Sequence, residues 1–250
     1  MATLKTQAVV IRSLDFGESD KLVTFFTKDL GKVKGIAKGA KRSKRRFGVN
    51  LEIFSLVLLY LREGRRLSLP LVEACDLINP FLSIRGELLK IAQASYFLEL
   101  IDEMMPEREA NERLFQLLTA ALSTIEEGEL TPSLSRVFEM KFLSLVGLSP
   151  QLYRCVVCQL PLEEAAELNF NSLKGGLVCP LCVPGAGPIL NLSQGTVKTL
   201  RRALELPLER MGRLLFSQTA LREAELVLSD FLKAQLGKEL KTVKFISRLS

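Results

Sequence analysis

Short apolar runs separated by polar turns occupy the first 80 residues, and this pattern is typical of β-strands. The apolar run from Leu51 is the longest, and the residues around Val33 alternate between apolar and basic. We predict five strands with these bounds: Thr3–Ser13, Lys21–Thr27, Lys32–Lys38, Leu51–Leu61 and Leu67–Ile78. Five strands in so short a stretch favour a small closed barrel.

The periodicity changes at Phe81, after which apolar residues recur every three to four positions and predict helices. The apolar stripe of the first helix includes Leu88 and Leu89. Proline and glycine mark the helix ends, and serine or threonine marks several starts. The expected helices run from Phe81 to Pro106, from Leu114 to Gly128, from Thr131 to Gly147, over a short stretch from Ser193, and from Ser217 or Thr219 to Gly237.

Together these elements predict an α+β protein of several domains. Residues 1–80 form the barrel, and residues 81–153 with 190–250 form a helical bundle. A cysteine-bearing segment, residues 154–189, is expected as an insertion between bundle helices. For the barrel, the OB-fold is the commonest five-stranded Greek-key barrel used on nucleic acids, while an SH3-like barrel stays open on pattern alone.

Composition removes several classes of protein from consideration. Hydrophobic residues make up 48% of the chain, yet its most apolar stretch, Ile53 to Leu61, is far shorter than the roughly 20 residues of a membrane-spanning helix. The N-terminus has no apolar signal-peptide core, so we expect a soluble, cytoplasmic chain. The absence of histidine excludes Ser-His-Asp and Cys-His nucleophiles, and no glycine-rich phosphate loop is present. The commonest equipment of catalysis is therefore missing, but Lys, Glu, Asp or Tyr could still do acid–base chemistry, so catalysis itself is not excluded.

Charge is distributed unevenly along the chain, whose net charge is +6. Residues 1–80 carry 15 Lys or Arg against 8 Asp or Glu, whereas residues 81–153 carry 6 against 11. A basic part beside an acidic part indicates one surface for a polyanion and a separate surface for another partner.

The basic residues concentrate in one glycine-containing segment that has no acid. Its cations are Lys32, Lys34, Lys38, Lys41, Arg42, Lys44, Arg45 and Arg46. Phe47 follows directly and is predicted to stack on a base, and Arg65 and Arg66 add a second basic group. A merely solvated loop is the alternative, but blocks of like charge usually mark interaction segments. We predict that this run binds nucleic-acid phosphates without reading sequence, because no recognition helix carries base-reading side chains.

Four of the five cysteines form two Cys-x-x-Cys pairs, Cys155 with Cys158 and Cys179 with Cys182. Twenty residues separate the pairs, which is a spacing typical of zinc sites. The intervening residues predict a β-hairpin, turning at Lys174–Gly176, that returns the second pair to the first. Disulfides, a redox pair and buried thiols are the alternatives, and a cytosolic chain disfavours the first. We predict one structural Zn²⁺ per chain, because four thiolates leave no open coordination position for catalysis.

Several motifs of the barrel region resemble one bacterial protein family. They are Val9-Val10-Ile11-Arg12, Phe16-Gly17-Glu18-Ser19-Asp20-Lys21-Leu22-Val23, Phe26-Thr27-Lys28, Gly31-Lys32-Val33, Ala37-Lys38-Gly39-Ala40-Lys41-Arg42 and Leu51-Glu52-Ile53-Phe54. In order and spacing they are similar to the RecO family of DNA repair proteins, and the helices and cysteine pairs keep the family's order to the C-terminus. Gly17, Glu18 and Asp20 match a turn of the family, and we assign them to folding.

The resemblance implies a recombination mediator of the RecF pathway, with an N-terminal OB domain, a helical domain and a zinc finger. Such proteins bind single- and double-stranded DNA, anneal complementary strands, and work with RecR to help RecA displace the single-strand-binding protein SSB. The family acts in the bacterial cytoplasm, at the nucleoid during repair, and contacts the acidic, apolar C-terminal tail of SSB. For that tail we predict Lys198, Arg201 and Arg202, with Arg136 and Lys141 behind them; an ordinary solvated helix face is the alternative.

Two other functions stay open on the sequence alone. An RNA-binding protein with an OB barrel and a zinc ribbon would share the charge pattern. A metal-dependent nuclease would need paired carboxylates around an open metal. Asp15, Glu18 and Asp20 lie close together, but in one turn rather than spread over strand ends.

Overall fold

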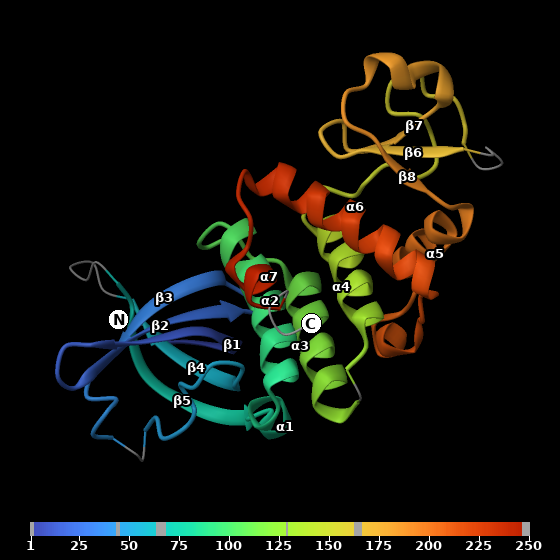
Figure 1. Cartoon of the computed structure of the whole chain (residues 1–250). Helices are drawn as coiled ribbons and strands as arrows, with labels where there is room; N and C mark the ends of the chain where they lie inside the picture. The colour runs from blue at the N-terminus through green and yellow to red at the C-terminus, as the bar shows by residue number, and fades with distance from the viewer. Residues whose placement is uncertain (1–2, 44–45, 64–68, 129, 163–166, 247–250) are drawn as a thin grey trace. The chain divides into compact units, whose positions relative to one another are not determined.

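The computed structural model describes residues 3–43, 46–63, 69–128, 130–162 and 167–246 of the chain (Figure 1). Its elements gather into two units, Met1–Glu127 with Phe245–Ser250, and Gly128–Lys244. The first unit contains the barrel and three helices, and the second contains the cysteine segment with three long helices. The finer division into residues 1–80, 81–153 with 190–250, and 154–189 stays a prediction.

Five strands of the first unit close into a barrel in the order β1-β2-β3-β5-β4. The strands are β1 (Thr3–Phe16), β2 (Asp20–Thr27), β3 (Gly31–Ala37), β4 (Leu56–Arg62) and β5 (Leu71–Asn79). Neighbours pair antiparallel, except that β3 meets β5 in parallel at Ile36 and Leu71. This closed five-stranded arrangement confirms the predicted OB-fold barrel.

The barrel interior is filled by alternate residues of the strands and by a turn segment. Val23, Phe25 and Val33 point inward from β2 and β3, in keeping with the two-residue period of a strand. The predicted strand from Leu51 begins only at Leu56, because residues 47–54 form successive turns whose Phe47 and Leu51 side chains enter the same core. Burial of each such side chain contributes about 1.5–3 kcal/mol.

Three helices complete the first unit: α1 (Leu82–Gly86), α2 (Leu88–Met104) and α3 (Glu112–Glu127). The single helix predicted from Phe81 is therefore wrong, since Glu87 is extended and separates α1 from α2. The Glu126 carboxylate of α3 accepts the N–H groups of Ser83 and Ile84 at 3.1 and 3.0 Å, which satisfies the start of α1. Leu88 and Leu89, at the start of α2, are exposed rather than part of the core.

The second unit combines helices with a small sheet of order β7-β6-β8. Its elements are α4 (Pro132–Leu145), β6 (Leu168–Asn171), β7 (Gly176–Val178), the 3₁₀ turn η1 (Pro180–Gly185), β8 (Leu190–Leu192), α5 (Gln194–Glu205), η2 (Leu208–Arg213) and α6 (Gln218–Leu236). The last helix among the described residues, α7, spans Lys241–Ile246.

The helix boundaries of the second unit follow the predicted capping signals. The Ser193 and Ser217 hydroxyls accept backbone N–H groups at the starts of α5 and α6. Gly237 ends α6 in the left-handed conformation, with φ of 67°. Across the described residues, no helix is both long enough and apolar enough to cross a membrane.

Candidate nucleic-acid interface and metal centre

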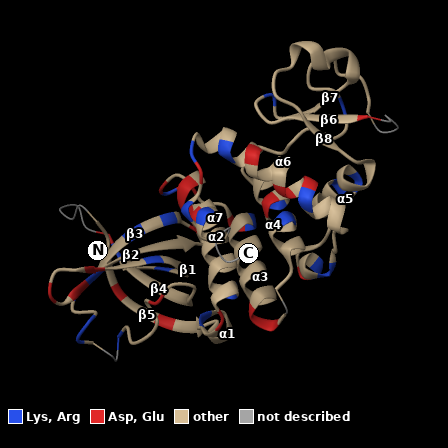
Figure 2. Ribbon diagram, viewed as in Figure 1, with Lys and Arg blue, Asp and Glu red and all other residues tan. Residues whose placement is uncertain are grey.

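The basic run divides into a part in the loop after β3, whose side chains are exposed, and a part on β3 itself, whose two lysines pair with acids of another segment. The exposed part, called the basic tip below, lies in the loop after β3 (Figure 2) and consists of Lys38, Lys41, Arg42 and Arg46. Four further predicted contacts, Lys44, Arg45, Arg65 and Arg66, lie outside the described residues.

Lys32 and Lys34 of β3 are paired with acids of the segment 102–112, which runs from the last turn of α2 to the first residue of α3. The Lys32 Nζ atom lies 3.2 Å from Asp102 Oδ1, and Lys34 Nζ lies 2.9 Å from Glu107 Oε1. The backbone of the segment also lies on β3, where the Arg108 N–H donates to the Lys32 carbonyl at 3.0 Å. Lys32 is only 9% exposed, so the structure places it inside the fold rather than on a DNA-contacting loop.

Phe47 does not have the position that a base-stacking residue needs. Its ring is 1% exposed and belongs to the barrel core together with Phe25 and Leu51. The Arg46 guanidinium lies 5.0 Å from the ring centroid. The predicted stacking of Phe47 on a base is therefore wrong, because no face of the ring is open to a base.

Residues at the turn between β1 and β2 bind the first residues of the loop that carries the basic tip. The Gly39 N–H donates to the Asp20 carboxylate at 2.8 Å, and this hydrogen bond is the main cause that keeps the pKa of Asp20 below its ordinary value. Lys41 Nζ lies 2.9 Å from Asp15 Oδ2 and donates to the Gly17 carbonyl at 3.1 Å. Two separated parts of the chain are thus joined at one end of the barrel.

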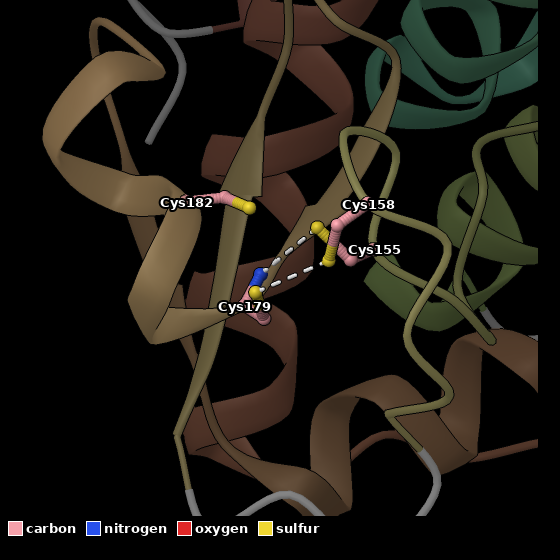
Figure 3. A group of neighbouring side chains, drawn as sticks. All are labelled: Cys155, Cys158, Cys179 and Cys182. Atoms are coloured by element: carbon pink, nitrogen blue, oxygen red, sulfur yellow. Dashed lines mark hydrogen bonds between the residues drawn. The ribbon is translucent and has the colours of Figure 1, made fainter.

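The four paired cysteines come together in the second unit (Figure 3). All their Sγ atoms lie within 4.8 Å of one another, and those of Cys158 and Cys179 are 3.6 Å apart. Four sulfurs bound tetrahedrally at about 2.3 Å would be about 3.8 Å apart. The predicted hairpin of β6 and β7 delivers Cys179 to the first pair, and η1 carries Cys182. The arrangement can hold one metal ion.

Backbone N–H groups of the cluster donate hydrogen bonds to the Cys155 sulfur, which stabilises its thiolate form. The N–H groups of Val157 and Cys179 donate to the Cys155 sulfur, each at 3.4 Å. Burial acts to raise the pKa of Cys155, but these hydrogen bonds, with one from the Cys158 backbone, outweigh it and hold the pKa at about 6. A thiolate is the form that binds a metal, so these donors favour the ligating state of Cys155, whereas the hydrogen bond with the Cys179 thiol is the main cause that raises the pKa of Cys182 to about 12.

Helix α5 carries the three cations predicted for a partner tail, and one of them is used inside the unit. The Arg201 Nε atom donates to the Leu152 carbonyl at 3.0 Å, and its guanidinium lies 4.4 Å from the Tyr153 ring centroid. Arg201 therefore attaches the segment before Cys155 to α5. Lys198 and Arg202 are exposed.

Comparisons with known proteins cover both parts of the chain. A family model described as Recombination protein O N terminal matches residues 1–81, and one described as Recombination protein O C terminal matches residues 85–244. A protein named DNA repair protein RecO from Syntrophus aciditrophicus is 39% identical over 99% of this chain and 96% of its own length. The chain belongs to the RecO family. Proteins of the same name from Anaeromyxobacter sp. strain K and Desulfatibacillum aliphaticivorans are 35% and 36% identical, each over 100% of this chain and 98% of its own length.

Membership of the RecO family supports a role in DNA repair and recombination, and the structure adds residues that the sequence pattern missed. One is Phe16, which stands exposed at the end of β1. Others are acids of segment 102–112, which pair with lysines of the barrel although the acidic charge predicted a separate partner surface. The clustering of acids after Asp102 was the available signal, but nothing in the sequence places that segment on β3.

Proposed function

We propose that the chain is a DNA repair and homologous recombination mediator that binds single- and double-stranded DNA without sequence specificity. It anneals complementary strands and, with RecR, helps load RecA onto DNA coated with SSB. It does this in the cytoplasm and without a covalent step. The observation that carries the proposal is the basic tip on the OB barrel of a chain that belongs to the RecO family.

The chemistry of the basic tip fits phosphates rather than base edges. Lysine and arginine neutralise the backbone charge, and each released counterion adds affinity that salt removes. Two complementary strands repel each other through their phosphates, so cations held on a rigid barrel favour their approach. The side chains of the tip are on a loop and not on a helix that fits the major groove, which suits binding without sequence preference.

The four cysteines are proposed to hold one structural Zn²⁺. Tetrahedral sites of four thiolates suit zinc or an iron–sulfur centre, and the hairpin with two Cys-x-x-Cys pairs is the usual zinc framework. The segment is small, and a metal would supply the cohesion that its few buried side chains do not.

The acidic, apolar tail of SSB is proposed to bind along α5, where Lys198 and Arg202 are exposed. A cation beside apolar surface is what such a tail requires. Arg201 is left out of the proposal because its guanidinium is engaged with Leu152 and Tyr153.

The test of DNA binding compares two triple variants with the same loss of charge. The first replaces Lys38, Arg42 and Arg46 with Gln, and the control replaces the exposed Arg210, Arg222 and Lys233 of the second unit. Binding to a labelled single strand is followed by fluorescence anisotropy over a salt series. Each lost phosphate contact lowers the salt slope by about 0.7, so the first variant should lose about 2 units of slope and at least about tenfold in affinity, while the control changes little.

Annealing of SSB-coated complementary strands by the same proteins tests the mediator role. The first variant should anneal slowly and the control at the rate of the unaltered chain. Equal affinity and equal annealing in both variants would remove the basic tip from the proposal, and preference for RNA over DNA in competition would favour an RNA-binding function instead.

A further inference from the structure

The outer face of β1 to β3 carries exposed apolar side chains at the end where the β1–β2 turn lies. Phe16 is 50% exposed and Leu14 is 44% exposed. Leu14 pairs with Leu22, which pairs with Ile36, so these three residues form one row across the sheet. Both Leu22 and Ile36 are half-buried. We call Phe16 with this row the apolar platform.

The platform does not belong to the barrel core. Val23, on the opposite face of β2, points into the interior, and residues adjacent in a strand point to opposite faces. Farther along β2, Phe26 is covered by Phe115 of α3, with ring centroids 6.4 Å apart. None of the ring contacts recorded among the described residues involves Phe16. The helices therefore cover one end of this face, and the platform lies at the other.

Both cations and acids border the platform: the cross-strand partner of Phe16 is Asp20, which accepts the Gly39 N–H, and Glu18 in the same turn is exposed. Arg12 is exposed and shares the face of Leu14, two residues along β1. The basic tip is attached to the same turn by the contacts of Lys41 with Asp15 and Gly17. Asp15 is paired with Lys41, so the charge left beside the apolar surface is that of Arg12 and of the remaining cations of the basic tip against Glu18 and Asp20. An aromatic ring with cations beside it complements a ligand that has flat apolar faces and a negative backbone.

We infer that the platform binds unpaired bases, with Phe16 stacking on one of them while the basic tip holds the phosphates, so that this chain distinguishes single strands from duplex. The inference rests on the proposed function and specifies its ligand. The faces of bases in a duplex are covered by their neighbours, whereas a single strand can offer them to an aromatic side chain. Stacking also leaves the hydrogen-bonding edges of the base free, and a strand held in this way stays able to pair with its complement.

The first test measures the ratio of affinities for a single strand and a duplex of equal length. Phe16→Ala should weaken single-strand binding about tenfold and leave duplex binding within about twofold, because stacking on one base is lost. Phe16→Tyr keeps a ring and should retain the ratio. Leu82→Ala is the matched control: Leu82 is the first residue of α1, just after the end of β5, and is 65% exposed. This variant should change neither affinity. An unchanged ratio in Phe16→Ala would overturn the inference.

The second test uses the absence of tryptophan from the chain. Phe16→Trp places a single fluorescent reporter on the platform, and Leu82→Trp provides the control. A single strand should quench the first and not the second, and duplex at the same saturation should quench neither. Quenching by an acidic, apolar peptide but not by the strand would overturn the inference in favour of a protein partner.

Failure of the inference and failure of the proposed function give different results. If the unaltered chain binds neither single strand nor duplex, the proposed function fails. If it binds both, and Phe16→Ala binds both with an unchanged ratio, only the stacking role fails. Circular dichroism and a thermal melt of every variant show that a loss of binding is not a loss of fold.

Discussion

Gly31 is held in a conformation and a position that no other residue fits. Its φ is +67°, in the left-handed region, and an added β-carbon would stand 2.1 Å from the Glu109 carbonyl oxygen. The glycine therefore allows the acidic segment 102–112 to lie directly on the barrel. Gly17 has a similar φ of +62°, but an added β-carbon there would meet nothing within 4 Å. Substitution of Gly17 therefore tests backbone strain alone, whereas substitution of Gly31 tests backbone strain together with close contact.

We expect Gly31→Ala to lower the free energy of unfolding by about 3 kcal/mol or more, and Gly17→Ala by about 1 kcal/mol. Both variants bear the cost of a positive φ, and only the first must also move the Glu109 backbone. Urea unfolding followed by circular dichroism measures the difference. Equal losses in the two variants would contradict the close packing of the acidic segment.

At the residue scale the sequence predicted what local chemistry decides. The cysteine spacing, the caps at Ser193 and Ser217 and the glycine at 237 depend on neighbours within a few positions. The role of Phe47 depends instead on a turn that directs its ring into the barrel, and the exposure of Phe16 depends on which part of the sheet the helices cover. Neither is encoded in a short window, so the sequence did not show that the ring nearest to the basic run is buried.

At the scale of elements, the strands were predictable from neighbouring residues, whereas the break between α1 and α2 depends on a residue distant in the chain. Turn residues and apolar runs placed β2 and β3 within one residue of each bound, although β2 is buried on both faces from Val23 to Thr27. The break at Glu87 was not predictable, because the groups that satisfy the start of α1 come from Glu126, about 40 residues away in the chain. The three-to-four-residue period of the apolar positions continues through that break.

The acidic segment and β3 form the contact with the clearest functional consequence. Glu107 pairs with Lys34 and Glu112 pairs with Lys28 at 3.3 Å, all four side chains being more than a third exposed. Exposed pairs contribute little to stability, about 0–1 kcal/mol each. They do, however, neutralise two cations on the barrel unit that would otherwise be available to phosphates.

We expect Glu107→Gln with Glu112→Gln to raise DNA affinity about threefold at low salt while changing the free energy of unfolding by less than about 1 kcal/mol. The gain should disappear at high salt, where screening weakens the freed lysines. Glu209→Gln with Glu225→Gln, at two exposed acids of the second unit, makes the same change in net charge. If the control raises affinity equally, the effect belongs to net charge and not to the release of Lys28 and Lys34.

At the scale of the whole chain, the basic tip and the cysteine cluster belong to different units. The tip belongs to the barrel, whose core contains none of the four clustered cysteines. The cluster belongs to the unit of α4 to α6, where Phe170 of β6 meets Phe231 of α6 with centroids 6.0 Å apart. A change in one unit should therefore leave the property of the other intact.

Loss of the metal is the measurement that tests this separation. Cys155→Ser removes one of the two fully buried sulfurs of the proposed four-sulfur metal site, and structural zinc in small domains contributes about 10–16 kcal/mol of binding free energy at neutral pH. The variant should lose its one equivalent of zinc by elemental analysis, and the second unit should become sensitive to limited proteolysis.

DNA affinity of Cys155→Ser should stay within about twofold of the unaltered chain, because the phosphate contacts of the basic tip lie on the barrel. Cys75→Ala is the matched control: Cys75 is buried in the barrel core outside the cluster, where burial raises its pKa to about 12, so it should keep the metal. Chelation of the unaltered chain should reproduce the serine variant. A metal-free protein that stays protease-resistant but loses DNA affinity would place the metal in the binding surface, and the separation of the two units would then be wrong.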